Sequence, residues 1–133
     1  MRLVTYTNAG NTRAGAMLDD KTIVDLHRAS GGELAADMIG ILNGGDEAMA
    51  TARSAVDATH AAGAAGASAT GVIFSLDLPG TQLEAPIPRP GKVLAIGLNY
   101  RDHAVESKQE LPKHPVVFSK ASTCIIGPGA PVH

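Results

Sequence analysis

Aromatic residues are scarce in this sequence, since Phe, Tyr and Trp together make up only 3% of it and Trp is missing altogether. Proteins that bind single-stranded nucleic acid by stacking bases need several aromatic faces, so the composition argues against that kind of binding. Hydrophobic residues nevertheless form 44% of the chain. We therefore expect a core built from Ala, Val, Ile and Leu, in one ordinary domain or two small ones.

An excess of charge of one sign is also missing. Lys and Arg number 11 and Asp and Glu number 13, which gives a formal net charge of −2 and leaves no basic stripe along the chain. Nucleic-acid-binding proteins carry clustered positive charge on one face or helix. We expect no nucleic-acid partner.

Cysteine is rare, and long apolar runs are absent. Cys124 is the single cysteine, so no disulfide can form within the chain, and a cytoplasmic location is the simplest expectation. No stretch reaches the roughly 18 consecutive apolar residues that a membrane-spanning helix needs. The first six residues are too short and too alternating for a signal peptide. We expect no membrane partner.

The first part of the chain has the pattern of a small antiparallel meander. Turn residues lie at positions 8–11 and 19–21, where Asn, Asp and Gly favour tight reversals of the chain. Three short segments separated by these turns are predicted to be strands: residues 2–6, 13–18 and 22–26. A further strand is predicted over residues 72–76.

Two helices are predicted between the third and the fourth of these strands. Ser30 and Glu33 have the spacing of a capping box, which predicts a helix over residues 34–42. Its large apolar side chains fall on one helical face: Leu34, Met38, Ile41 and Leu42. Asp46 predicts the start of a second helix, which runs to about residue 60 through an alanine-rich stretch of high helix propensity.

A proline-rich segment divides the chain. Pro79-Gly80 breaks the preceding pattern, and prolines at 86, 88 and 90 enforce an extended backbone. We expect residues 1–78 to form a small N-terminal domain, residues 79–90 to be a linker, and residues 91–133 to begin a second domain. Strands are predicted there over residues 92–96 and 116–120, with a helical turn over residues 100–106.

The helical turn carries the most informative chemistry. His103 and Glu106 are three residues apart, which puts both side chains on one face of a helix. A carboxylate beside an imidazole raises its basicity and fixes its tautomer. Such a pair can orient a water molecule and accept its proton. An exposed helical turn with a weak ion pair has the same pattern, and so does a pair of zinc or iron ligands.

The surroundings of this pair are more specific than the pair itself. A Pro-rich approach and a strand lead into Gly97-Leu98-Asn99-Tyr100, and Pro115-Val116-Val117-Phe118-Ser119-Lys120 and Gly127-Pro128-Gly129 follow the helical turn. This order resembles the entry to the catalytic domain of the fumarylacetoacetate hydrolase family. The opening meander is similar to the small N-terminal domain of many bacterial members. The resemblance implies an α+β fold, in which a small domain of meander and helices precedes a mixed, mainly β catalytic domain.

The resemblance also implies roles for individual residues. His103 and Glu106 match the family's water-activating pair, and Lys120 matches an active-site lysine whose ammonium could stabilise an enolate or oxyanion. Asn99 and Tyr100 match the motif at the substrate-binding turn, which they would shape without taking part in the chemistry. Family members bind Mg²⁺ or Mn²⁺ through acidic residues that include a Glu-x-Glu pair. No Glu-x-Glu occurs in this sequence, so we expect the metal ligands to lie outside it.

By resemblance, the leading function is metal-assisted hydrolysis of a carbon–carbon bond in an acylpyruvate or β-diketo acid, carried out by water that the His–Glu pair activates. Keto–enol isomerisation, decarboxylation and dehydration of a keto acid are open alternatives for the same pair. The implied partners are a small keto-acid substrate and, in a complete enzyme, a second copy of the chain. A further alternative is an inactive truncated fragment or an interaction module, and we expect the 133-residue chain alone to be inactive.

Overall fold

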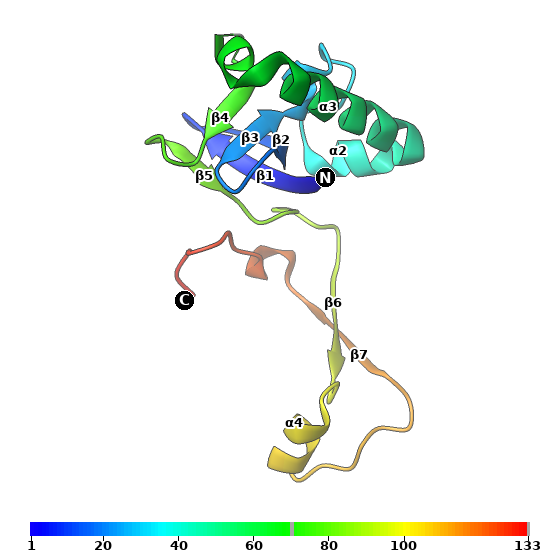
Figure 1. The fold of residues 1–133 in the computed structure, drawn as a ribbon. Coiled ribbons are helices and arrows are strands. Elements are labelled where there is room, and N and C mark those ends of the chain that lie inside the picture. The colour runs from blue at the N-terminus through cyan, green and yellow to red at the C-terminus, as the bar shows by residue number, and fades with distance from the viewer. Residues whose placement is uncertain (70, 133) are drawn as a thin grey trace. The chain divides into compact units, whose positions relative to one another are not determined.

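The computed structural model describes residues 1–69 and 71–132, with the backbone alone for residues 64–69. These residues divide into two compact units. One unit contains Met1–Pro88 and the residues from Ile126 onward, and the other contains Arg89–Ile125. Strands and helices follow one another in groups along the chain, with antiparallel pairing of the strands, and the predicted α+β class is confirmed (Figure 1).

The first unit is built on a five-stranded antiparallel sheet with the strand order β4-β3-β2-β1-β5. Its strands are β1 (Arg2–Asn8), β2 (Asn11–Met17), β3 (Thr22–Asp25), β4 (Ile73–Ser75) and β5 (Thr81–Leu83). In the β1–β2 turn, Ala9 (φ 46°) and Gly10 (φ 81°) both lie in the left-handed region. That backbone is the type I′ turn, whose twist matches the strands it joins. The predicted meander is confirmed.

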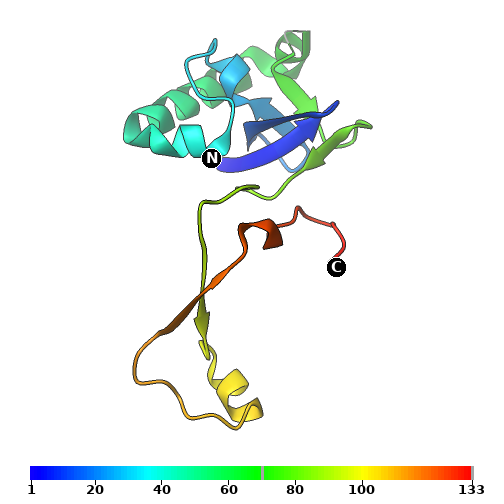
Figure 2. The same cartoon turned by 180° about the vertical axis from the view of Figure 1, so that it is seen from behind.

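Three helices complete this unit and cover one face of the sheet (Figures 1 and 2). They are α1 (Leu26–Ala29), α2 (Met38–Asn43) and α3 (Gly45–Ala69). Fully buried Ala14 and Ala16 on β2 leave room for Leu26, Met38 and Ile41 to pack over the strand. The cluster between the sheet and the helices therefore contains no aromatic side chain, and Tyr6 is the one aromatic residue that is fully buried among the described residues. Among the described residues, no helix combines the length and hydropathy needed to cross a membrane.

The helix predicted over residues 34–42 begins later than expected, so the capping-box prediction is wrong. Ser30 ends α1: its hydroxyl donates to the His27 carbonyl (3.0 Å) and accepts the Leu34 N–H (3.0 Å). The glycines that follow it have φ values of 67° and 93°, which a helix does not contain. Asp37 caps α2 instead, by accepting the Gly40 N–H at 2.9 Å.

The second predicted helix is confirmed in its position but is longer than expected. It starts at Gly45, one residue before Asp46, which we predicted as its N-terminus. It extends to Ala69, whereas we predicted an end near residue 60. Gly63 interrupts it with a non-helical backbone (φ 74°, ψ 156°). Glycine adopts this conformation at little steric cost, so the kink falls at the residue best able to accommodate it.

A buried carboxylate joins the sheet to the helices. Asp25 is 0% exposed, and it accepts hydrogen bonds from the Tyr6 hydroxyl (2.8 Å) and the Arg28 backbone N–H (2.9 Å). The Nε atoms of Arg13 and Arg28 lie 3.8 and 3.7 Å from its Oδ2 atom. Burial first, and then the hydrogen bond to Asp25, raise the pKa of Tyr6 far above its ordinary value. Tyr6 therefore keeps its proton and remains the donor.

Aromatic and cationic groups extend this cluster to β4. The ring of Phe74 lies 5.3 Å from that of Tyr6, measured between centroids, and the Arg28 guanidinium lies 5.6 Å from the centre of the Phe74 ring. The same guanidinium donates to the Gly71 carbonyl at 2.8 Å. Cation–π and aromatic pairs of this kind stabilise by about 0.5–1.5 kcal/mol each. The cluster thus ties β1, β3, α1 and β4 together.

The second unit consists of a two-stranded ribbon and a short helix. Its elements are β6 (Val93–Gly97), α4 (Arg101–Glu106), β7 (Val116–Lys120) and the 3₁₀ turn η1 (Ser122–Cys124). β6 and β7 pair antiparallel, with Val93 opposite Lys120 and Gly97 opposite Val116. These predicted strands and the predicted helical turn are confirmed. β5 lies within residues 79–90, which we expected to be a linker. The predicted domains, residues 1–78 and 91–133, stay a prediction.

The Asp25 cluster makes a stability prediction. Tyr6→Phe should lower the free energy of unfolding by about 1.5–3 kcal/mol, because it removes a hydrogen bond to a buried charge. Asp25→Ala should lower it by about 3–5 kcal/mol, because it leaves buried partners without their anion. Asp20→Asn is the matched control. It breaks the exposed Arg2–Asp20 pair and should cost under about 1 kcal/mol. Urea unfolding followed by circular dichroism measures all three, and equal costs for Asp25→Ala and Asp20→Asn would contradict the assignment.

Candidate functional site

The helix α4 starts after a sharp turn at the end of β6. Leu98 has φ 51°, a left-handed conformation that costs a non-glycine residue about 1–2 kcal/mol. Tyr100 is the N-cap, with an extended backbone and no side-chain hydrogen bond to the helix. Asn99 and Tyr100 are both exposed and lie directly before the first helical turn. The turn therefore sets the direction in which α4 leaves the strand.

The other end of α4 is closed by a second left-handed residue. Lys108 has φ 52°, and its backbone N–H donates to the Val105 carbonyl (3.1 Å). The backbone N–H of Gln109 donates to the Ala104 carbonyl (2.9 Å). This is the Schellman arrangement, in which glycine is the usual left-handed residue. A six-residue helix is thus bracketed by two bulky residues in an unfavourable backbone region. Strained residues of this kind concentrate at functional sites.

The side chains of His103 and Glu106 share one side of α4. At about 100° of rotation per residue, both lie away from Ala104 and about 60° from each other. Ala104 is the one buried residue of the helix, at 2% exposure, whereas His103 and Glu106 are exposed. No ion pair or hydrogen bond joins the two side chains in the described part of the chain. The arrangement gives a pair of groups that could act on one external molecule.

Lys120 lies at the opposite end of the ribbon from α4. It pairs with Val93, whereas α4 follows Gly97 at the other end of β6. Four strand residues span about 13 Å. Its ammonium lies 5.8 Å from the centre of the Phe118 ring, so the side chain runs back along β7. The structure therefore brings together His103, Glu106, Asn99 and Tyr100 around α4 but not Lys120, and the roles of all five stay a prediction.

A divalent metal does not fit the residues that the structure describes. Among them, no group of three or more His, Cys, Asp or Glu side chains converges as a metal site requires. Mg²⁺ and Mn²⁺ need several oxygen ligands, and α4 offers only Asp102 and Glu106 beside His103. The metal implied by the family resemblance is therefore without a ligand set in this part of the chain.

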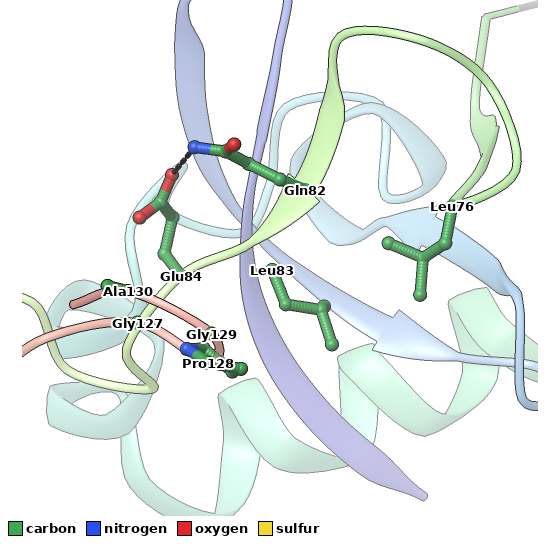
Figure 3. A pocket seen from close by; sticks show the side chains of 8 residues that line it. All are labelled: Leu76, Gln82, Leu83, Glu84, Gly127, Pro128, Gly129 and Ala130. Carbon is green, nitrogen blue, oxygen red and sulfur yellow. Dashed lines mark hydrogen bonds between the residues drawn. The ribbon is translucent and has the colours of Figure 1, made fainter.

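A cavity in the first unit was not expected from the sequence (Figure 3). Its volume is about 400 Å³. It lies between β5 and a Gly-Pro-Gly turn, and it is lined by Leu76, Gln82, Leu83, Glu84, Gly127, Pro128, Gly129 and Ala130. A Cβ atom on Gly127 would lie 3.3 Å from the Cα of Glu84 and from the Leu83 carbonyl oxygen, so glycine lets the turn approach β5 closely without a tight contact.

The Glu84 carboxylate in this cavity accepts hydrogen bonds from neighbouring side chains. Gln82 donates to Glu84 at 2.9 Å, the bond drawn in Figure 3. Hydrogen bonds from Thr7 and then Gln82 hold the pKa of Glu84 below its ordinary value, against a smaller effect of burial. Glu84 is the one titratable side chain among the described lining residues, and the cavity lies beside β5, the edge strand of the sheet.

The hydrogen bonds from Thr7 and Gln82 predict how Glu84 titrates. A carboxyl group with a lowered pKa adds stability above its unfolded-state pKa and loses that contribution as the pH falls through its folded-state value. Gln82→Leu combined with Thr7→Val should raise the pKa of Glu84 towards the ordinary value, because both donors are removed. Carboxyl-carbon NMR titration measures the shift. An unchanged Glu84 titration would contradict the hydrogen-bond explanation.

Comparison with known proteins finds relatives that match almost the whole length of the chain. No family model matches it. It is 33% identical over 99% of its length to the mitochondrial oxaloacetate tautomerase fahd2 of Xenopus laevis, of which it covers 38%. It is also 33% identical over 86% of its length to the oxaloacetate tautomerase YisK of Bacillus subtilis, of which it covers 39%. A Burkholderia ambifaria protein named as a hydrolase is 34% identical over 96% of the chain and is covered to 38%.

A solved structure has a similar fold. A Mycobacterium smegmatis protein assigned as HpcE superposes on 99% of this chain with a TM-score of 0.66 and 28% sequence identity, and the match covers 40% of that protein. The chain thus spans about two fifths of the length of the relatives it matches.

Proposed function

This chain belongs to the fumarylacetoacetate hydrolase family, and we propose that it supplies the proton-transferring side chains for keto–enol tautomerisation of a small 2-keto acid. The single observation that supports this most is the placement of His103 and Glu106. Both lie on the open side of α4, away from buried Ala104, in a chain that is 33% identical to two oxaloacetate tautomerases.

The chemistry needs only one proton to move. A 2-keto dicarboxylic acid carries a CH₂ group beside its carbonyl. The His103 imidazole accepts a proton from that carbon, the electron pair of the C–H bond forms the C=C bond, and the π pair of the carbonyl moves to oxygen to give the enolate. The His103 imidazolium then donates the same proton to that oxygen, which gives the enol and restores the neutral imidazole. No bond to a leaving group breaks. The Glu106 carboxylate, on the same side of α4, would stabilise the imidazolium that forms.

The other candidate residues have smaller parts in this proposal. Asn99 and Tyr100 flank the start of α4 and would contact the substrate carboxylates through their amide and hydroxyl groups. Lys120 would stabilise the enolate oxygen, but this requires it to approach α4 from the far end of the ribbon. The Mg²⁺ or Mn²⁺ that the resemblance implies has no ligand set among the described residues, so no step is assigned to a metal.

Hydrolysis of a carbon–carbon bond in an acylpyruvate is the second candidate. The relative from Burkholderia ambifaria that is named as a hydrolase supports it. The same imidazole would take a proton from water instead of from carbon, so the geometry of α4 serves both reactions. Tautomerisation is proposed first because two of the three relatives described above are named as oxaloacetate tautomerases and one as a hydrolase.

A chimeric enzyme tests the proposal. The matched region of the Bacillus subtilis tautomerase is replaced by this chain, and turnover of oxaloacetate and of an acylpyruvate is measured. We expect oxaloacetate tautomerisation, with His103→Ala and Glu106→Gln each lowering kcat by about 10²–10⁴, the usual scale for a general base. His114→Ala is the control, because His114 is exposed and lies outside α4. Faster turnover of the acylpyruvate would favour hydrolysis. Unchanged kcat in His103→Ala would refute the pair's role in both reactions.

A further inference from the structure

A second cavity of the first unit lies between the end of β2 and the helix α3. Its volume is about 320 Å³, within the range of about 300–1,000 Å³ that small-molecule sites occupy. Its apolar side is lined by Met1, Met17, Leu18 and Val56. Leu18 lies two residues after buried Ala16, so it points to the same face of the sheet, the face that the helices cover. The cavity is therefore an apolar recess under one flank of α3.

The polar side of this cavity comes from α3 alone. Arg53, Asp57 and His60 line it together with Val56. These four residues have the spacing i, i+3, i+4 and i+7, which places them along one face of the helix. The three polar side chains are exposed, whereas Val56 is half-buried. The helix thus presents a cation, an anion and an imidazole along the rim of an apolar recess.

The two opposite charges on this rim do not neutralise each other. Arg53 and Asp57 are one helical turn apart, yet no ion pair joins them in the described part of the chain. Their order along the helix explains this, because such pairs are more favourable when the acidic residue precedes the basic one. Neither Arg53 nor Asp57 forms an ion pair with any other described residue. Both charges are therefore available to a molecule in the cavity.

The arrangement of charge selects the class of molecule. A guanidinium binds a carboxylate through two parallel N–H bonds, and a carboxylate binds an ammonium through charge-assisted hydrogen bonds. A molecule that engages Arg53 and Asp57 together carries both groups close to each other, since the two residues are one turn apart. Its remaining atoms lie against the apolar side, where methionine side chains adapt to different shapes. An α-amino acid with an aliphatic side chain has all three features. A dicarboxylate would place like charge against Asp57.

We propose that this cavity binds an aliphatic α-amino acid. Arg53 holds the carboxylate of the ligand, Asp57 holds its ammonium group, and Met17 and Leu18 contact its side chain. The proposal uses no residue of α4. It can therefore fail while the proton transfer by His103 holds, and the reverse is also true.

Calorimetric titration of the 133-residue chain with L-leucine tests the proposal. We expect one molecule to bind per chain, with a dissociation constant at or below about 1 mM, within the range for ligands of this size. Three probes each lack one group: 4-methylpentanoate lacks the ammonium, 3-methylbutylamine lacks the carboxylate, and glycine lacks the side chain. Each should bind at least about tenfold more weakly than L-leucine, because each leaves one part of the site without its partner.

Two substitutions assign the two charges to their partners. Arg53→Gln and Asp57→Asn should each weaken L-leucine binding by at least about tenfold. Arg53→Gln should also remove the preference for L-leucine over 3-methylbutylamine, and Asp57→Asn the preference over 4-methylpentanoate, as a double-mutant cycle requires of interacting groups. Glu47→Gln is the control, because Glu47 is exposed on the same helix and outside the cavity. It should change neither affinity nor preference. Circular dichroism melting checks that all three variants stay folded.

Several results would overturn the proposal. No heat from L-leucine up to about 10 mM would show that the cavity is not an amino-acid site. Equal binding of L-leucine and 4-methylpentanoate would make it a carboxylate site only. Full affinity in both Arg53→Gln and Asp57→Asn would place the ligand elsewhere. A dimer of the chain that either substitution converts to a monomer would make a second copy the occupant. If the chain aggregates, the same titrations are made on the chimera with the Bacillus subtilis tautomerase, with the same expected ranking.

Discussion

The carboxylate of Asp25 is the point where the elements of the first unit meet. It ends β3, accepts the Tyr6 hydroxyl from β1, and caps α1 through the Arg28 N–H. A buried charge is tolerated only when its partners are all in place. The start of α1 at the end of β3 is therefore coupled to the pairing of β1, β2 and β3. Phe74 and Arg28 extend the same coupling to β4, across more than forty residues of intervening chain.

The second unit has no buried group of this kind among its described residues. Its large apolar side chains are exposed, and Ala104 is its one buried hydrophobic residue. The backbone strain at Leu98 and Lys108 nevertheless fixes the way α4 leaves the ribbon. A strained turn persists only when its surroundings determine it. The candidate pair His103 and Glu106 thus lies on a short helix whose direction is set by the residues at its two ends.

The sequence predicted the parts of the fold that depend on local chemistry. The hairpin at residues 8–11 and the helical turn at α4 follow from Asn, Gly and apolar periodicity, which act over a few residues. The start of α2 was missed because Ser30 and Asp37 both suit a cap, and the choice depends on where α1 ends. β5 was missed because its partner, β1, lies more than seventy residues away. The distance of Lys120 from α4 is likewise set by strand register, which spacing along the sequence does not reveal.

Amide hydrogen exchange on the 133-residue chain tests most directly whether it combines a self-supporting first unit with a ribbon that depends on further polypeptide. The amides of β1, β2 and β3 are expected to exchange only through unfolding of the whole first unit, at rates that Tyr6→Phe increases. The amides of β6 and β7 are expected to exchange orders of magnitude faster, because two strands without packed faces open readily. Equal protection of β6–β7 and β1–β2 in a monomeric chain would contradict this division.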